Sequence, residues 1–181
     1  MPDKKKAARL AREGFDLWQA GRLQEAVQSY REALACADPD HFGTPDYHGE
    51  FGAVLAALDR NEESREEYER SLTDTIRQPG TEDSIVVVMA RWFLGQQLLK
   101  MHRPKEALAT VEPSLKLDSQ SGIIPKLGPL RIVQARALWQ LGRAAEARES
   151  ARVALAAAAS DDDRARIREE LTGLLQDSDV G

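Results

Sequence analysis

The chain has 181 residues, 42% of them hydrophobic and 30% charged, a balance that suits one folded domain and argues against wholesale disorder. Its formal net charge of -5 gives no general attraction to nucleic acid or acidic lipid, so neither nucleic acid nor membrane is expected as a partner. There is no secretory signal after the first lysines, no apolar run near the roughly 20 residues of a membrane span, and no second cysteine to pair with Cys36. These features predict a cytoplasmic protein.

Residues that favour helices, chiefly Ala, Leu, Glu, Arg and Gln, dominate from end to end, and Gly and Pro separate amphipathic segments of about 14–20 residues. This pattern predicts helical hairpins in series. The expected hairpins cover residues 5–38, 44–78, 83–117 and 124–159. A capping helix over 160–176 follows, with Ser160 and Asp163 at capping-box spacing, and completes a single domain of residues 1–176. Residues 177–181 are expected to be a loose tail.

Four repeats align without internal gaps when a small residue is taken as the anchor of each: Gly14, Gly52, Gly95 and Ala135. In every repeat a leucine lies three positions after the anchor, an arginine eight after, a glutamate eleven after, another small residue twelve after, and a small residue followed by leucine nineteen after. Small residues allow the two helices of a hairpin to approach closely. The glutamate falls in the first turn of the second helix, where negative charge suits the helix dipole. The arginine is within reach of that glutamate, and we interpret the pair as structural.

This order of small and leucine positions resembles the tetratricopeptide repeat (TPR), in which an aromatic residue follows the second small position. That position holds Tyr30 and Tyr68 in the first two repeats but Val111 and Ala151 in the last two. The anchors are 38, 43 and 40 residues apart, longer than the usual spacing of about 34 in that family. The resemblance implies an all-α fold of the alpha-alpha superhelix class, a TPR-like solenoid of four helical hairpins plus a C-terminal capping helix. It does not specify a function, because the fold is a scaffold with many uses.

No nucleophile motif, phosphate-binding glycine loop or paired cysteine spacing is present in the sequence. We therefore predict no catalytic residue, no cofactor and no metal ligand. The chain is not expected to be an enzyme. The densest polar cluster is the segment from His41 to His48 with its neighbouring aspartates. Its spacing matches no known ligand pattern, and Asp beside Pro is ordinary loop chemistry. A metal-dependent hydrolase at the His41–His48 loop is kept as a remote alternative.

The first helix of each hairpin carries the functional hypothesis, since the resemblance places these helices on the concave side of a solenoid. All three tryptophans fall on the stripe that faces this side. Family members that bind a terminal carboxylate carry Lys and Asn where this chain has Ala11, Phe15 and Gly49, so that mode is not expected. We instead predict an apolar groove formed by Phe15, Trp18, Gln19, Gly49, Ala53, Ala56, Trp92, Gln96, Leu99, Lys100, Arg136 and Trp139.

The predicted function is a protein- or peptide-binding scaffold that takes an apolar or amphipathic segment, such as an amphipathic helix, into this groove. Arg136, Lys100 and Gln96 would favour a segment with at least one acidic group. An adaptor, a chaperone-like protein and a toxin-neutralising protein are not distinguished. The alternative is a self-associating scaffold whose groove receives a second copy of the chain. It also stays open that the tryptophans only pack against neighbouring helices, in which case they would not contact a partner protein.

Overall fold

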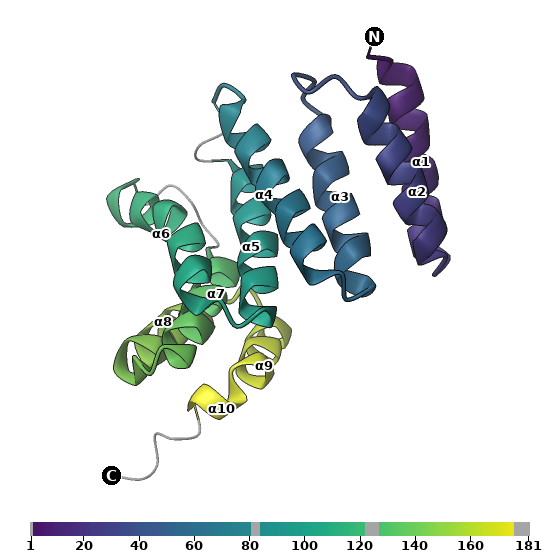
Figure 1. Ribbon diagram of the computed structural model, residues 1–181. Coiled ribbons are helices and arrows are strands. Elements are labelled where there is room, and N and C mark those ends of the chain that lie inside the picture. The colour runs from purple at the N-terminus through teal and green to yellow at the C-terminus, as the bar shows by residue number, and fades with distance from the viewer. Residues whose placement is uncertain (1, 81–83, 122–126, 176–181) are drawn as a thin grey trace. The chain divides into compact units, whose positions relative to one another are not determined.

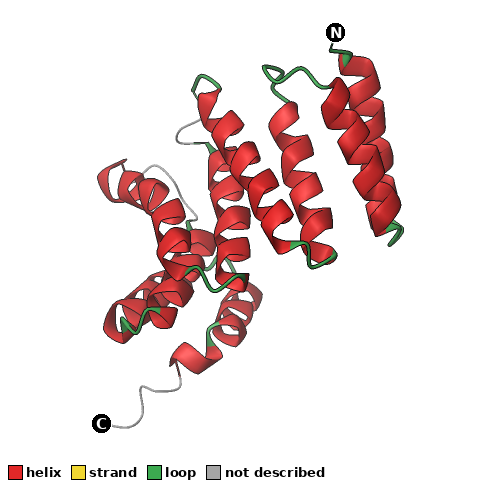
Figure 2. Ribbon diagram, in the orientation of Figure 1, coloured by secondary structure: helices red, strands yellow, loops and turns green. Residues whose placement is uncertain are grey.

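The computed structural model describes residues 2–80, 84–121 and 127–175, and within these ranges every regular element is an α-helix (Figures 1 and 2). The all-α prediction is therefore confirmed, and even the β-branched run Ile85–Val88 lies in a helix. The helices are α1 (Lys4–Gln19), α2 (Leu23–Cys36), α3 (Thr44–Ala57), α4 (Asn61–Arg77), α5 (Ile85–Lys100), α6 (Pro104–Ser121), α7 (Gly128–Gln140), α8 (Ala144–Ala156), α9 (Asp161–Glu170) and α10 (Thr172–Leu175).

The chain divides into two compact units, residues 1–93 and 94–181, and the boundary lies inside α5. Helices α1–α4 and the first half of α5 form unit 1, and the remainder of α5 and α6–α10 form unit 2. The single domain expected over residues 1–176, with its four repeat boundaries, stays a prediction. The tail expected over residues 177–181 lies outside the described residues.

The anchor glycines hold the hairpins of unit 1 together closely. A Cβ atom added to Gly14 would lie 2.9 Å from the Tyr30 ring, and one added to Gly52 would lie 2.9 Å from the Tyr68 ring. Each tyrosine comes from the second helix of the same hairpin and occupies the space that a side chain on the first helix would need. The ring and the glycine backbone therefore form one contact, which explains why the anchor and the aromatic residue recur together in these two repeats.

The turn inside each hairpin has the same geometry in all four repeats. The seventh residue after the anchor has a positive φ in every case, and the residues are Gly21, Asp59, His102 and Gly142, with φ of 73°, 55°, 55° and 75°. The predicted arginine–glutamate pair follows this residue. The arginine Nε donates to the glutamate Oε1 at 2.6 Å in the first repeat and 2.7 Å in the other three. The pair is confirmed as a structural feature that recurs at the start of each second helix.

The core of unit 1 lies between the two hairpins of α1–α4. Tyr30 is fully buried and stacks on Phe51, with ring centroids 6.0 Å apart, while Val54 and Leu55 fill the space beside them. Because a buried hydroxyl needs a partner, Tyr30 donates its phenolic proton to Glu50 Oε2 at 2.9 Å. This bond fixes an acidic side chain of α3 at the edge of an apolar core.

Unit 2 ends in the capping helix expected from the sequence. The Ser160 hydroxyl accepts a hydrogen bond from Asp163 N at 3.0 Å, so the predicted N-terminal cap is present. Ile167, Leu171 and Leu174 are buried, and the helix is interrupted at Leu171 between α9 and α10. In the described ranges, no helix combines the length and the apolar character that a membrane crossing requires.

Candidate functional site

A pocket of about 340 Å³ opens on the surface of unit 1 among helices α1, α3, α4 and α5. The first half of α5 forms one wall, and α3 forms another. The residues that line it are Trp18, Asp46, Gly49, Glu50, Ala53, Ser71, Thr75, Ile85, Val86, Met89, Ala90 and Phe93. We call this the unit 1 pocket.

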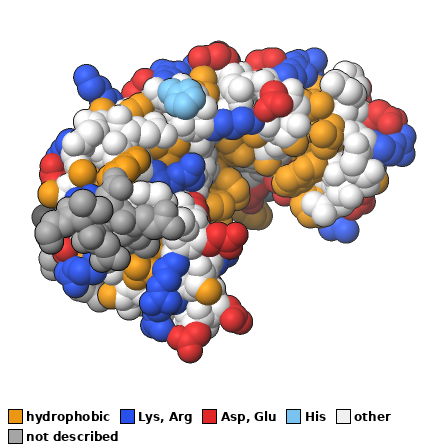
Figure 3. Space-filling model, turned by 90° about the horizontal axis from the view of Figure 1, so that it is seen from below, with side chains coloured by type: hydrophobic (Ala, Val, Ile, Leu, Met, Phe, Trp, Pro, Cys, Tyr) orange, Lys and Arg blue, Asp and Glu red, His pale blue; other side chains and the backbone are white. Residues whose placement is uncertain are grey.

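The α5 wall is apolar and open to solvent. Ile85, Val86, Met89 and Phe93 are 66%, 47%, 38% and 37% exposed, and all four line the pocket. Phe93 is held in place by stacking on Tyr68, with ring centroids 5.7 Å apart and planes 9° apart. Figure 3 shows apolar side chains gathered on the part of the surface that unit 1 forms, toward the right of the view. Four exposed large apolar side chains on one short segment are typical of a surface that another molecule covers.

The α3 wall contributes small residues and two carboxylates. Gly49 and Ala53 leave the space open, while Asp46 and Glu50 place their side chains on the same helix face four residues apart. Partial burial raises the pKa of both carboxyl groups above the ordinary value. At Glu50 burial outweighs the hydrogen bond from Tyr30 and the charge of Arg12, both of which lower the pKa. The pocket therefore combines apolar walls with carboxylates that are incompletely solvated.

A second, smaller pocket of about 260 Å³ lies beside it in unit 1, between α1 and α3, and is lined by Ala8, Ala11, Arg12, Phe15, Tyr47 and Glu50. Phe15 contacts Trp18 edge to face, with ring centroids 5.9 Å apart. The Arg12 guanidinium lies 5.9 Å from the Phe15 ring centroid and pairs with Asp16 at 3.2 Å. Glu50 lines both pockets, so they form neighbouring parts of one surface.

Three of the predicted groove residues, Trp18, Gly49 and Ala53, meet in the unit 1 pocket. Phe15 lies in the neighbouring pocket. The other predicted residues of unit 1 lie outside the lining of both: Gln19 is exposed at the end of α1, Ala56 is half-buried on α3, and Trp92 is half-buried against Phe93. Most of the α5 wall is formed by Ile85, Val86 and Phe93, which are not among the predicted groove residues.

The predicted residues of unit 2 have a different environment. Arg136 Nη1 donates to Gln96 Oε1 at 3.0 Å and forms an ion pair with Glu170 of α9 at 3.4 Å. Trp139 and Arg136 line a pocket of about 180 Å³ together with Glu170, Leu171 and Leu174 of the capping segment. The chain's own C-terminal helices therefore contribute an acidic and apolar surface next to the two side chains that we expected to meet a partner.

Leu99 requires a correction, because it is only 2% exposed and belongs to the core of unit 2 rather than to an accessible groove. Its neighbour Leu98 is equally buried, at 1%. Lys100 is exposed at the end of α5, as expected for a residue that could meet solvent or a partner. A continuous channel from Phe15 to Trp139 stays a prediction, since units 1 and 2 are described separately.

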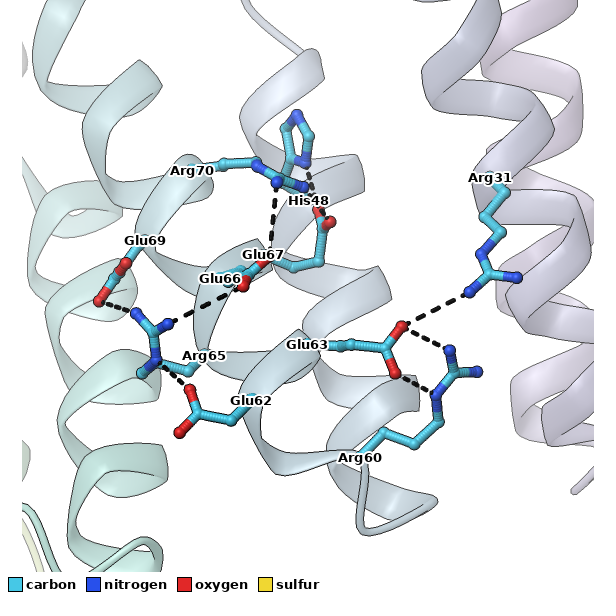
Figure 4. A network of polar contacts seen from close by, with 10 residues as sticks. All are labelled: Arg31, His48, Arg60, Glu62, Glu63, Arg65, Glu66, Glu67, Glu69 and Arg70. Carbon is cyan, nitrogen blue, oxygen red and sulfur yellow. Dashed lines mark hydrogen bonds and ion pairs between the residues drawn. The ribbon is translucent and has the colours of Figure 1, made fainter.

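The segment from His41 to His48 does not bring its histidines to a common partner. His48 Nδ1 lies 2.6 Å from Glu67 Oε2, and Arg70 Nη1 contacts the other oxygen of the same carboxylate at 2.5 Å (Figure 4). His41 instead accepts a hydrogen bond from the backbone of Gly43 at 3.2 Å. Within the described part of the chain, no three His, Cys, Asp or Glu side chains are grouped so that they could hold a metal ion.

The His48 pair belongs to a charged network along α4, which carries Glu62, Glu63, Glu66, Glu67 and Glu69 beside Arg65 and Arg70 (Figure 4). Arg65 forms ion pairs with Glu62 at 2.8 Å and with Glu69 at 2.6 Å. These partners lie three residues before and four residues after Arg65, which are the spacings of neighbours on a solvated helix face. Arg31 of α2 pairs with Glu63 at 3.5 Å and connects the two hairpins of unit 1. These contacts are structural, and the hydrolase alternative has no supporting geometry in this network.

Comparison with known proteins supports the fold. No family model and no curated protein sequence matches the chain. Among solved structures, a kinesin light chain-like protein of Podosopora anserina, made of nearly identical TPR-like repeats, aligns with a TM-score of 0.75 and 18% identity over 97% of this chain and 88% of its own. The chain has a TPR-like fold.

Two further TPR-like neighbours are similar to this chain at comparable levels. The apo form of RapI aligns with a TM-score of 0.80 and 15% identity over 94% of this chain and 63% of RapI. PilF of Pseudomonas aeruginosa aligns with a TM-score of 0.69 and 19% identity over 96% of this chain and 69% of PilF. At these identities the TPR-like proteins share a fold, and the residues of the unit 1 pocket must be interpreted from their own chemistry.

Proposed function

We propose that this TPR-like chain is a non-catalytic protein-binding scaffold, and that the unit 1 pocket takes the apolar face of an amphipathic segment from another protein. The observation that carries the proposal is the α5 wall, with Ile85, Val86, Met89 and Phe93 all more than a third exposed around one opening. A volume of about 340 Å³ is at the lower end of the range of small-ligand sites, and it accommodates anchoring side chains rather than a whole segment.

An amphipathic helix suits this arrangement because it presents side chains at intervals of three and four residues along one face. The unit 1 pocket and its neighbour on α1 and α3 share Glu50, so one helix can place an anchor in each of them. The small residues Gly49 and Ala53 allow such a helix to approach the α3 backbone closely. Covering the exposed apolar wall would then stabilise the complex by about 25 cal/mol per Å² of apolar area, less the costs of association.

The test is selection of binding peptides from a displayed random library, using the whole chain as bait. Val86→Asp and Met89→Asp place a charge on the α5 wall at exposed positions, so they should abolish binding and leave the helix content unchanged. Phe42→Asp is the matched control, because Phe42 is 76% exposed and does not line the pocket. Failure to enrich any peptide, or peptides that bind both pocket variants as well as wild type, would refute the proposal.

Measurement of the mass in solution by light scattering distinguishes a partner segment from a second copy of the chain. If the scaffold acts on other proteins, the unbound chain should remain a monomer at the concentrations used for selection. A concentration-dependent dimer that Met89→Asp dissociates would instead assign the unit 1 pocket to self-association.

A further inference from the structure

The carboxylates of the unit 1 pocket indicate the charge of what binds there. Asp46 and Glu50 are separated by one helical turn on α3, and their Cβ atoms are therefore neighbours on one face, about 5–6 Å apart. Among the described residues that line the pocket, they are the only ionisable ones, and the others are apolar residues, one glycine, one serine and one threonine. The opening is therefore acidic as well as apolar.

The existing contacts of these two carboxylates leave their charge largely uncompensated. Glu50 accepts a hydrogen bond from the neutral phenol of Tyr30 and lies within the influence of Arg12, but Arg12 forms its ion pair with Asp16. Asp46 has no hydrogen bond or ion pair with any side chain of the described residues, and its charge raises the pKa of Glu50. Two neighbouring like charges at the edge of an apolar surface are unfavourable until a cation joins them.

On the basis of the proposed function, we infer that the segment bound by the unit 1 pocket is cationic, with a lysine or arginine placed between its apolar anchors. The aliphatic stem of that residue would lie along the α5 wall, and its charged head would meet Asp46 and Glu50. This assignment reverses the acidic partner that Arg136, Lys100 and Gln96 predict from the sequence, and in unit 2 Arg136 already pairs with Glu170.

The chemistry of the lining favours this class of side chain over the alternatives. Lysine and arginine have long apolar stems and a terminal charge, and therefore match a surface that is apolar on one wall and acidic on the other. Trp18 and Phe93 add aromatic faces, which attract cations. A segment with an acidic residue at the same place would face two carboxylates in a partly desolvated site, so the pocket discriminates by repulsion as well as by attraction.

The experiment uses three synthetic helical peptides with one identical leucine face and a polar face of lysine, glutamine or glutamate. Their affinities for the whole chain are measured by fluorescence anisotropy at low and at physiological salt. We expect the lysine peptide to bind at least about tenfold more tightly than the glutamine peptide, as for charge-assisted hydrogen bonds, and the glutamate peptide to bind most weakly. The preference for lysine should decrease as salt screens it.

Two double variants distinguish the pocket from the general negative charge of the chain. Asp46→Asn with Glu50→Gln keeps the shape and retains an oxygen acceptor for Tyr30, and it should reduce the ratio of lysine-peptide to glutamine-peptide affinity to about one. Glu13→Gln with Glu32→Gln removes the same number of charges at exposed positions of α1 and α2 outside the pocket, and it should keep the preference.

The outcomes separate this inference from the function on which it rests. Equal affinity of wild type for all three peptides, or an equal loss of preference in both double variants, overturns the cationic assignment and leaves the apolar pocket in place. If none of the peptides binds, both proposals fail for amphipathic helices.

Discussion

Gly52→Ala tests the close contact that defines the hairpins. The added Cβ would lie 2.9, 3.0 and 3.2 Å from three atoms of the Tyr68 ring, which is 5% exposed and cannot move into solvent without exposing core surface. Overpacking of this kind costs about 1–3 kcal/mol. Replacing glycine by alanine inside a helix stabilises the folded state by about 1 kcal/mol through helix propensity. The variant should therefore be between unchanged and about 2 kcal/mol less stable than wild type.

Gly49→Ala is the matched control, because it makes the same substitution on the same helix. Its Cβ would lie 3.3 Å from Ser71 Oγ, a contact that a small side-chain movement relieves. The control keeps the propensity gain, so the two variants should differ by about 1–3 kcal/mol, or roughly 2–12 °C in the Tm measured by circular dichroism. Combining Gly52→Ala with Tyr68→Leu should cost less than the sum of the two changes. Equal Tm values for the two alanine variants would refute the proposed contact.

Three further predictions concern stability and are measured as Tm. Ala26→Leu should destabilise the chain by about 1–3 kcal/mol because Ala26 is fully buried, whereas Ala158→Leu at a half-buried position outside the repeat columns should matter less. Equal shifts would show that the repeat register is wrong. His102→Gly should raise Tm by roughly 2–4 °C, since a φ of 55° costs a residue with a Cβ about 1 kcal/mol. The control His102→Ala keeps that backbone cost. An equal rise in the Tm of His102→Ala would contradict the explanation. Burial raises the pKa of Tyr68 to about 12. The stability that depends on its neutral phenol is complete below the ordinary pKa of about 10 and is lost as the pH rises through 12, so Tyr68→Phe should reduce the fall in Tm over this interval. If Tm falls equally with rising pH in Tyr68→Phe and in wild type, Tyr68 is not a source of the loss of stability at alkaline pH.

The fold could be predicted from the sequence because its determinants are local and repeated. The small anchor residue, the small residue twelve positions later and the turn arginine–glutamate pair all act within one hairpin, so four repeats supply four independent observations of the same geometry. The position of the turn was predictable, but its left-handed backbone at Asp59 and His102 was not, because neither residue is glycine. The break at Leu171 between α9 and α10 has no breaker residue before it.

The site was predicted less completely, for reasons that α5 illustrates. The apolar residues of this helix are not confined to one face, so periodicity does not distinguish the exposed Val86 and Phe93 from the buried Leu98 and Leu99. On α1 and α3, where polar residues mark the outer face, three of the predicted groove residues, Trp18, Gly49 and Ala53, line the unit 1 pocket. The Arg136–Glu170 pair joins residues 34 positions apart, and no local pattern reports a contact of that range.

The repeated turn affects how local unfolding of one hairpin influences the other hairpins. Each hairpin contains its own left-handed turn residue and its own arginine–glutamate pair, and the contacts that close it lie within the same stretch of chain. Opening one hairpin therefore removes only the interfaces with its neighbours, and the closing interactions of the other hairpins stay intact. Amide hydrogen exchange should accordingly proceed in blocks of hairpin size, and whole hairpins are the natural units for deletion or duplication.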